Sequence, residues 1–442
     1  MKNKLIKLIK SRGVKVGVIG MGYVGLPLAV GFAEKNINVI GLEIDSRKID
    51  AIKSAKDTIS GITPDRILKS CSGIDPKLEI TTDYDHLEKV DVVIICVPTP
   101  LKDDMTPDLS FIESTAMEIS HRLREGMLIV LESTTYPGTT EELLSPIFES
   151  TRPLGNALNP GSDYFLAFSP ERIDPGRTDY TIKNTPKIVG GVTENCTEVA
   201  AELYKILVDR VVTVSSAKTA EMVKLLENTY RLVNIGLANE FALICDALEV
   251  DVWEVIDAAA TKPFGYTAFY PGPGLGGHCI PVDPLYLSWK LSQIEHESKF
   301  INLATEINQN MCGYVVNKIE EALKTNGKRM ENAKILVLGV AYKPDVSDVR
   351  ESPGIRLISS LIEAKTEVSY HDMFVPEINL EDECMFSVEL TKQSLSSADC
   401  VVITTGHSYY PIDMIIDSSS IIVDTRNAAK KYQGEPQNVI KI

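Results

Sequence analysis

A cysteine in a glycine-rich segment is the side chain of this sequence best suited to covalent chemistry. The segment runs from Gly272 to Asp283, reads GPGLGGHCIPVD, and carries Cys279. Glycines let a backbone wrap closely around a ligand, and a thiol presented by such a loop can serve as a nucleophile. We therefore predict that Cys279 is a nucleophile, with a structural thiol as the alternative. Its neighbour His278 is as well explained by a loop contact as by a base, and receives no catalytic role.

The other seven cysteines have no such surroundings. They include no CxxC pair and no cysteine–histidine spacing typical of a metal site. Buried thiols in a reducing compartment are the simplest interpretation for a chain of this length. We therefore predict no metal centre and a cytoplasmic protein.

A second segment has the spacing of a dinucleotide-binding turn. The sequence GMGYVG is a GxGxxG pattern that follows an apolar run at 14–20 and precedes a helical pattern from Leu26 to Glu34. The first glycine permits the tight turn, the second lets the backbone approach a pyrophosphate, and the third allows close helix–strand packing. The N–H groups of the following helix can face the phosphates. We therefore predict cofactor contacts at Gly20, Gly22, Tyr23, Val24 and Gly25.

The identity of the cofactor follows from an acidic residue beyond this turn. A carboxylate about 20 positions after the fingerprint accepts hydrogen bonds from the adenosine ribose and repels a 2′-phosphate, so NAD is predicted rather than NADP. Glu43 is our choice for that ligand, and Asp45 is interpreted as a solvated turn residue. Pro98 and Thr99 follow a later apolar run, at the carboxyl edge of the expected sheet, and complete the predicted cofactor site.

The order of apolar runs predicts the fold that positions these residues. Valine- and isoleucine-rich runs alternate with helical patterns, as in a doubly wound parallel sheet. The strands expected in a first sheet lie at 14–20, 38–45, 90–98, 127–133 and 164–170, and those of a second sheet at 334–344, 366–372, 399–406 and 420–427. One long helix is expected from Lys218 to about Leu248, with helical character again from Pro284 to Leu323.

The class expected is therefore α/β, with two Rossmann-like doubly wound parallel sheets joined by a central helical region. We divide the chain into an NAD-binding domain at 1–210, a central helical region with the cysteine loop at 211–325, and a C-terminal α/β domain at 326–442. The second sheet lacks a full glycine fingerprint, which argues against a second dinucleotide site. Lys343 and Arg350 there could pair with a diphosphate, although solvated ion pairs are the alternative.

The net charge of the chain limits its partners. With 61 acidic and 45 basic residues the formal charge is −16, and such an average field repels a polyanion such as DNA. A local cluster of lysine and arginine can still bind a small anion. No run approaches the ~20 apolar residues of a membrane span. The basic start, MKNKLIKLIKSRG, is expected to form a short helix or a loose tail.

Several stretches together resemble the UDP-glucose/GDP-mannose dehydrogenase family. Besides the fingerprint and the cysteine loop, they are Glu132-Ser133-Thr134, Pro137-Gly138-Thr139, Phe168-Ser169-Pro170-Glu171, Glu221 to Asn228 with Asn239-Glu240, and Gly339 to Pro353. They follow the family order over nearly the whole chain. The resemblance implies an NAD domain, a central dimerisation region, a C-terminal domain that binds the nucleotide sugar, and a four-electron oxidation at C6. A homodimer or higher homo-oligomer is therefore expected.

The resemblance also implies roles for individual residues. Cys279 matches the family's nucleophile, and Lys224 with Asn228 matches the pair that stabilises the oxyanion. Glu171 and Thr134 match groups near the hydrolytic water, Thr134 also lies among the cofactor contacts, and Asp283 matches an acid beside the cysteine. The candidate substrate contacts are Glu171, Arg172, Lys224, Asn228, Tyr270, Gly272, Gly276, Lys343 and Arg426.

Elementary chemistry agrees with two of these roles. Lys224 and Asn228 are four residues apart on one helix, so they reach the same point, and a cation there would stabilise an alkoxide or tetrahedral oxyanion. Glu171 follows a strand-ending Ser-Pro, where sheets place functional groups, although a helix-capping carboxylate is the alternative. A cysteine adduct explains how an aldehyde can lose a second hydride, because the aldehyde has no good route to that step until a nucleophile adds to it.

The sequence departs from the UDP-glucose branch of that family at three positions. Pro175 stands where that branch has a second acid, Val282 stands where it often has lysine, and His278 precedes the cysteine. These features resemble the branch acting on N-acetylated UDP-hexosamines. UDP-N-acetylglucosamine is the first choice of substrate, with UDP-N-acetylmannosamine or UDP-glucose as alternatives. A single-hydride hydroxy-acid dehydrogenase and a non-catalytic NAD-binding sensor are the competing functions.

Overall fold

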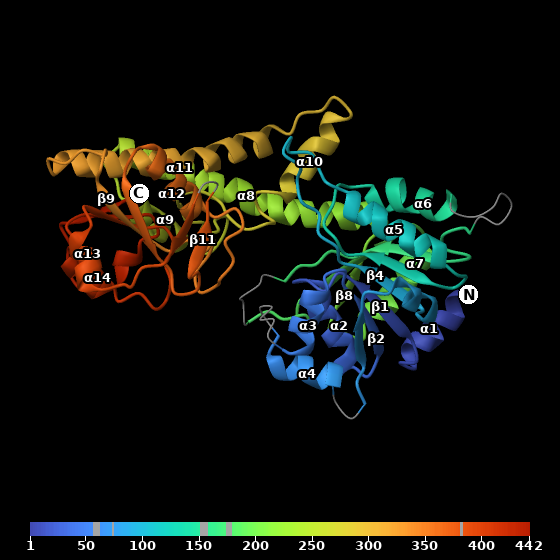
Figure 1. Cartoon of the computed structure of the whole chain (residues 1–442). Coiled ribbons are helices and arrows are strands. Elements are labelled where there is room, and N and C mark those ends of the chain that lie inside the picture. The colour runs from blue at the N-terminus through green and yellow to red at the C-terminus, as the bar shows by residue number, and fades with distance from the viewer. Residues whose placement is uncertain (56–61, 73–74, 151–157, 174–178, 381–382) are drawn as a thin grey trace. The chain divides into compact units, whose positions relative to one another are not determined.

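The computed structural model describes residues 1–55, 62–72, 75–150, 158–173, 179–380 and 383–442. The chain divides into two compact units. The first consists of Met1–Glu227 with Trp289–Glu295, and the second of Asn228–Ser288 with His296–Ile442. Each unit is built on a sheet of its own with helices against it (Figure 1). The α/β class with two separate sheets, as the sequence predicted, is confirmed.

The first unit contains an eight-stranded sheet in the order β3-β2-β1-β4-β5-β6-β7-β8. Strands β1 to β6 are mutually parallel, and their order is that of a Rossmann fold, in which the strand order reverses at β1 and creates a crevice for a dinucleotide. The strands are β1 Lys15–Ile19, β2 Asn38–Leu42, β3 Leu78–Thr81, β4 Val92–Ile95, β5 Leu128–Leu131, β6 Phe165–Phe168, β7 Lys187–Gly191 and β8 Val211–Thr213.

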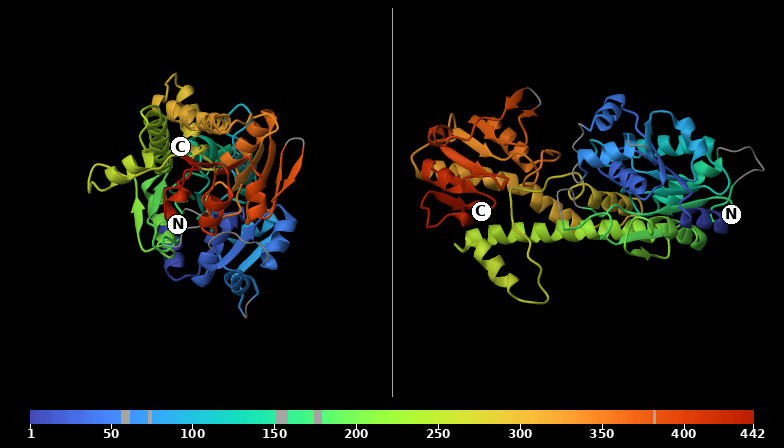
Figure 2. Two further views of the ribbon diagram at one scale, coloured as in Figure 1. Left: turned by 90° about the vertical axis from the view of Figure 1, so that its left-hand side faces the viewer. Right: turned by 90° about the horizontal axis from the view of Figure 1, so that it is seen from below.

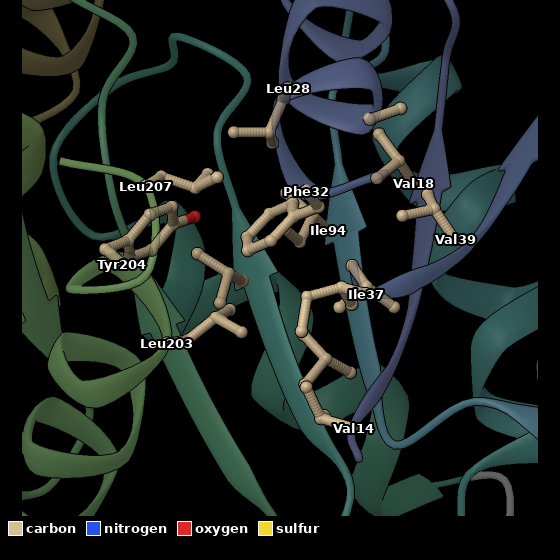
Figure 3. Packing of buried hydrophobic residues seen from close by; sticks show 14 of the residues in the cluster. Val14, Val18, Leu28, Phe32, Ile37, Val39, Ile94, Leu203, Tyr204 and Leu207 are labelled. Carbon is tan, nitrogen blue, oxygen red and sulfur yellow. The ribbon is translucent and has the colours of Figure 1, made fainter. Parts of the chain in front are cut away.

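Helices cover both faces of this sheet, which explains why its strands are almost continuously apolar. One core cluster joins the sheet to α1, α2 and α7, and a second joins its other face to α5 and α6. Figure 3 shows the first cluster, where Phe32 and Leu28 of α2 pack toward Ile94 and Leu203. The helices are α1 Lys2–Lys10, α2 Gly25–Glu34, α3 Ser46–Lys53, α4 Pro64–Ser72, α5 Ser110–Arg122, α6 Ser145–Ser150 and α7 Glu194–Tyr204.

The sheet departs from the expected all-parallel arrangement at β7. This strand runs antiparallel to β6, and β8 is parallel to β7. A parallel neighbour requires a crossover connection, usually a helix, and the described part of the segment between β6 and β7 contains no helix. The chain therefore returns beside β6 in the opposite direction, so the first residue of β7 lies at the carboxyl edge of the parallel strands.

The second unit contains a five-stranded parallel sheet in the order β10-β9-β13-β14-β15, and a separate pair, β11 with β12. Apolar clusters lie on both faces, one with α11 and α12 and the other with α13 and α14. The strands are β9 Lys334–Leu338, β10 Glu367–His371, β11 Glu377–Asn379, β12 Cys384–Phe386, β13 Cys400–Ile403, β14 Ile422–Asp424 and β15 Val439–Lys441. The helices of the C-terminal sheet are α12 Pro353–Glu363, α13 Lys392–Ser397 and α14 Ile412–Ser418.

The predicted long helix is α8, Ala217–Ala247, and its second half belongs to the second unit. There it packs alongside α11, Lys299–Thr325 (Figure 2). A Cβ on Gly236 would lie 3.1 Å from the Cβ of Ala304, so the two helices approach closely. Helical character expected from Pro284 to Leu323 is divided between α10, Asp283–Ser292, and α11. The remaining helix of this region is α9, Val252–Ala260.

A buried amide fixes the packing of α11 on α8. Asn308 accepts a hydrogen bond of 2.7 Å from the side chain of Asn239 and donates to the carbonyl oxygens of Ala304 and Leu232 at 2.7 and 3.4 Å. Asn308→Ala should lower the free energy of unfolding by about 1–3 kcal/mol, because the buried amide of Asn239 loses its acceptor.

Urea denaturation followed by circular dichroism measures this effect. Asn310→Ala, on the exposed side of the same helix, is the matched control and should change stability by less than about 0.5 kcal/mol. Equal stabilities for the two variants would contradict the role of Asn308.

Candidate active site

The fingerprint turn has the geometry of a phosphate-binding loop. It connects the end of β1 to the start of α2, and Gly20 has a φ of +91°, which glycine adopts without strain. A Cβ on Gly25 would overlap the carbonyl oxygen of Gly20, whereas a Cβ on Gly22 would meet nothing closer than the Lys48 ammonium at 3.9 Å. The space over Gly22 is therefore open to a pyrophosphate, and the residues present fit NAD.

The two acids after β2 have different partners. Glu43 accepts from the Met21 N–H at 3.2 Å and forms an ion pair of 2.9 Å with Lys48. Asp45 instead caps α3, accepting from the Arg47 N–H at 2.9 Å. Glu43 thus lies against the fingerprint turn, as a ribose ligand should.

The other predicted cofactor residues lie at the same edge of the sheet. Pro98 and Thr99 follow β4, and Thr134 follows β5. The hydroxyl of Ser133 donates to the carbonyl oxygen of Val97 at 2.7 Å, which ties the two segments together. These residues therefore share the carboxyl edge with the fingerprint turn.

Glu171 lies just beyond β6 and is held on both carboxylate oxygens. One oxygen accepts from the N–H groups of Arg172 and Ile173 at 2.8 and 2.7 Å, and the other lies 3.3 Å from the ammonium of Lys187. Burial alone would raise the pKa of Glu171, but Lys187, these N–H groups and the charge of Lys224 together lower it. Glu171 is therefore ionised at neutral pH, with Lys224 in electrostatic reach.

Three residues around Glu171 had no role in the sequence analysis. Lys187 forms a 2.7 Å ion pair with Glu132, and the hydroxyl of Tyr204 donates to Glu132. All three side chains are buried. No sequence signal indicates that Lys187 and Tyr204 contact Glu132, because the contact of Lys187 depends on the reversed direction of β7.

Arg172, a predicted substrate contact, is engaged within the protein. Its guanidinium pairs with Glu227 of α8 at 2.5 Å and donates to the carbonyl oxygen of Pro186 at 2.6 Å. Arg172 thereby ties the segment after β6 to the helix that carries Lys224. Its contact with substrate stays a prediction, and Pro175 lies outside the described residues.

In the second unit, backbone contacts hold the cysteine loop. The N–H of Gly272 donates to the side chain of Asn239 on α8 at 2.9 Å, and the N–H of Gly277 donates to the carbonyl oxygen of Arg350 at 2.9 Å. A Cβ on Gly276 would lie 2.7 Å from the Cβ of Tyr342. Glycine at 276 is therefore required by the approach of the segment after β9.

Cys279 is half-buried and lies in the turn that leads into α10, which begins at Asp283. Its carbonyl oxygen accepts from the N–H of Asp283 at 2.8 Å, and the carboxylate of Asp283 accepts from the side-chain amide of Asn228 at 2.5 Å. Asn228 and Asp283 are both buried. The structure thus brings together three predicted catalytic residues, with Asp283 orienting the amide of Asn228 and bonded through its backbone to Cys279.

The predicted substrate residues of the C-terminal sheet flank this loop. A Cβ on Gly272 would overlap the guanidinium of Arg426, which donates to the carbonyl oxygen of Thr404 at 2.8 Å. Burial lowers the pKa of Arg426 to about 10, against the opposing charge of Asp424, so it remains a cation at neutral pH. The ammonium of Lys343 lies 5.7 Å from the ring of Tyr342, which covers the loop.

Tyr270 is directed toward α9. Its ring stacks on Trp253 with centroids 5.7 Å apart, and its hydroxyl donates to Asp257 at 2.9 Å. The candidate residues form two groups, one in each unit. The first unit holds the cofactor residues with Glu171, Arg172 and Lys224. The second unit holds Asn228, Tyr270, the cysteine loop, Lys343 and Arg426. Among the described residues, no cluster of histidine, cysteine, aspartate and glutamate is arranged to hold a metal ion.

A Rossmann sheet with an open glycine turn and an acid after β2 is typical of an NAD-binding domain, and the second unit adds a cysteine on a glycine-rich loop. The chain belongs to the UDP-glucose/GDP-mannose dehydrogenase family. The family's NAD-binding domain matches residues 14–208, its central domain 218–310 and its UDP-binding domain 336–431. The chain is therefore an NAD-dependent nucleotide-sugar dehydrogenase, as the sequence resemblance predicted.

Individual relatives cover nearly the whole chain. It is 36% identical over 408 residues to a UDP-N-acetyl-D-mannosamine dehydrogenase of Campylobacter jejuni, covering 90% of this chain and 96% of the relative. It is 34% identical over 416 residues to an NDP-N-acetyl-D-galactosaminuronic acid dehydrogenase of Ralstonia solanacearum, covering 93% and 95%. The solved UDP-D-ManNAc dehydrogenase of Pyrococcus horikoshii has a TM-score of 0.83 at 34% identity, covering 97% and 98%.

The pairing of Glu43 with Lys48 leads to a prediction about the cofactor. Glu43→Gln removes the negative charge and leaves the Lys48 ammonium unneutralised, which favours a 2′-phosphate. The preference for NAD over NADP, measured as the ratio of kcat/KM values, should fall at least tenfold, equivalent to about 1.4 kcal/mol.

Asp45→Asn is the matched control, because it changes a neighbouring acid that caps α3. That variant should keep the wild-type preference. A larger loss of preference in Asp45→Asn than in Glu43→Gln would reverse the assignment of the ribose ligand.

Proposed function

We propose that this protein oxidises the C6 hydroxyl of a UDP-N-acetylhexosamine to a carboxylate, a four-electron reaction through covalent intermediates on Cys279. The observation that carries this proposal is the loop that presents Cys279 next to Asp283 and the Asn228 amide. An enzyme that transfers a single hydride needs no such thiol.

Each proposed role follows from a residue's chemistry. NAD⁺ bound at the fingerprint supplies a hydride acceptor for each of the two oxidations. The thiolate of Cys279 attacks the intermediate aldehyde to give a thiohemiacetal, whose oxyanion Lys224 and Asn228 stabilise. The second oxidation leaves a thioester on Cys279. Glu171 orders the water that releases the acid, and Thr134 and Asp283 are the further groups proposed to act near that water.

The substrate's nucleotide is assigned to the C-terminal domain, since the family's UDP-binding domain matches there. Arg426 and Lys343 supply cationic groups for a diphosphate, and Arg426 is buried enough to be a strong partner. Gly272 and Gly276 allow the backbone to approach the sugar, and Arg172 and Tyr270 are the remaining proposed contacts.

The names of the relatives favour UDP-N-acetylmannosamine over UDP-N-acetylglucosamine, which was the first choice from the sequence. Those of Campylobacter jejuni and Pyrococcus horikoshii are named UDP-N-acetyl-D-mannosamine dehydrogenases. UDP-N-acetylmannosamine is therefore the proposed substrate, and UDP-N-acetylglucosamine and UDP-glucose are the alternatives to assay beside it. A cytoplasmic location is part of the proposal, because free thiols are kept reduced there.

Counting NADH tests the reaction. Wild-type protein should release two NADH per UDP-sugar and form the uronic acid, whereas a single-hydride dehydrogenase would release one. Cys279→Ala should lower acid formation at least ~1,000-fold, because the aldehyde has no covalent route to the second oxidation, while NAD binding measured by calorimetry is retained.

Cys384→Ala is the control, since it removes an exposed thiol, and it should behave as wild type. Normal acid formation by Cys279→Ala would refute the nucleophile. Full retention of the protein's biological function in that variant would favour the NAD-binding sensor.

A homodimer is the proposed assembly. On the second half of α8, Leu237, Phe241 and Ile244 recur at intervals of four and three residues, so they share one face, and Leu248 follows just past the end of the helix. All four are exposed. Such an apolar stripe is typical of a helix that packs against another. The proposed partner is a second copy of this chain, through the central region that the family resemblance assigns to dimerisation.

Phe241→Glu should weaken this dimer by more than about 2 kcal/mol, because the charge is buried on both sides of a two-fold interface. Light scattering across a concentration series measures the shift from dimer to monomer. Met117→Glu, at an exposed apolar position of α5, is the control. A monomeric wild-type protein, or an unchanged dimer in Phe241→Glu, would contradict the proposal.

A further inference from the structure

Lys187 is the first residue of β7 and lies beside the carboxyl end of β6. In the antiparallel ladder Phe168 is paired with Gly190. Continuing that register past the end of β6 brings Glu171 opposite Lys187, and the ammonium of Lys187 lies 3.3 Å from the Glu171 carboxylate. The contact is therefore a direct consequence of the reversed direction of β7.

The ammonium of Lys187 is enclosed by protein groups. Its side chain is 8% exposed, and its second carboxylate partner, Glu132 at 2.7 Å, is fully buried. Tyr204 donates its hydroxyl to the other oxygen of Glu132, and its ring lies 5.2 Å from the ammonium. Figure 3 shows the ring of Tyr204 in the apolar cluster, near Leu207 and Leu203. These contacts leave Lys187 little freedom to move.

The charges of this cluster favour an ionised Glu171. Burial would lower the pKa of Lys187, but Glu132 and Glu171 outweigh that effect and raise it, so the ammonium persists. Burial raises the pKa of Glu132, with Lys187 opposing. The pKa of Glu171, by contrast, is lowered, because Lys187 and the two N–H groups outweigh the effect of burial.

The same contacts also orient Glu171. A carboxylate offers about four acceptor positions. Two N–H groups occupy positions on one oxygen and Lys187 occupies one on the other. These contacts fix the direction in which the remaining acceptor position points. A carboxylate held in this way can order one water molecule.

We propose that Lys187 is a positioning residue for thioester hydrolysis, acting through the carboxylate of Glu171. The inference rests on the proposed function. In this step the water oxygen bonds to the acyl carbon, the carbon–sulfur bond breaks, and its electron pair leaves on the sulfur of Cys279. One proton of the water passes to Glu171, and the other is released to solvent as the product acid ionises.

Rapid mixing with NAD⁺ and the UDP-sugar that wild type oxidises fastest tests this role. In Lys187→Met, two NADH per protomer should appear at close to the wild-type rate, because Glu171 orders water only for the hydrolysis that follows the two oxidations. Steady-state turnover should then fall at least tenfold, and intact-mass spectra should show the acylated protein. Lys187→Arg, which keeps the charge, should regain part of the turnover and lose the adduct.

The double variant Lys187→Met/Glu132→Gln guards against misfolding of the single one, since it avoids leaving a buried carboxylate without its partner. It should accumulate the same adduct. Wild-type turnover without adduct in the double variant would overturn the proposal. An equal loss of the rapid phase and of steady-state turnover in Lys187→Met would also overturn it, because that result indicates a structural role for Lys187. Release of only one NADH per UDP-sugar by wild type would instead overturn the proposed function.

Discussion

The position of Cys279 depends on the close approach of the glycine-rich loop to its neighbours. Backbone N–H groups of the loop bond to its neighbours: Gly272 donates to the side chain of Asn239, and Gly277 donates to the carbonyl oxygen of Arg350. A Cβ on Gly276 would come within 2.7 Å of the Cβ of Tyr342. Because the loop is bonded both to α8 and to the segment that follows β9, the position of Cys279 depends on both.

In the first unit, charged side chains gather at the carboxyl edge of the sheet. Parallel strands end at one edge, where Gly20, Glu43 and Thr134 collect beside the cofactor turn. The reversal of β7 adds Lys187 to that edge, and its ammonium compensates two carboxylates that burial would otherwise neutralise. A change of strand direction thus has a chemical consequence, an ionised and oriented Glu171.

Much of this arrangement could be predicted from the sequence, for identifiable reasons. The strands of the Rossmann sheet are short apolar runs buried on both faces, and α8 is a long pattern with helical spacing, so both were located closely. The motif glycines and Cys279 are informative because few structures other than tight loops need such spacing. The sequence placed Glu43 beside the fingerprint, where the structure has it, but it gave Asp45 only as a solvated turn residue, whereas Asp45 caps α3.

What escaped prediction depends on contacts between residues distant in sequence. The reversal of β7 has no local signal, so the pairing of Lys187 with Glu132 and Glu171 could not be foreseen. The engagement of Arg172 by Glu227, and of Tyr270 by Trp253 and Asp257, likewise requires the tertiary structure. The sugar is a harder case, because the choice among N-acetylhexosamines depends on a few atoms in a pocket that no sequence motif describes.

Covalent attachment of the sugar to Cys279 is the central claim, and locating the adduct tests it most directly. Wild-type protein would be mixed with NAD⁺ and UDP-N-acetylmannosamine, quenched with acid within the first turnover, digested, and analysed by mass spectrometry. We expect an acyl nucleotide-sugar adduct on the peptide that contains Cys279. Acid formation with no adduct on that peptide at any quench time, or an adduct on a different residue, would contradict that claim.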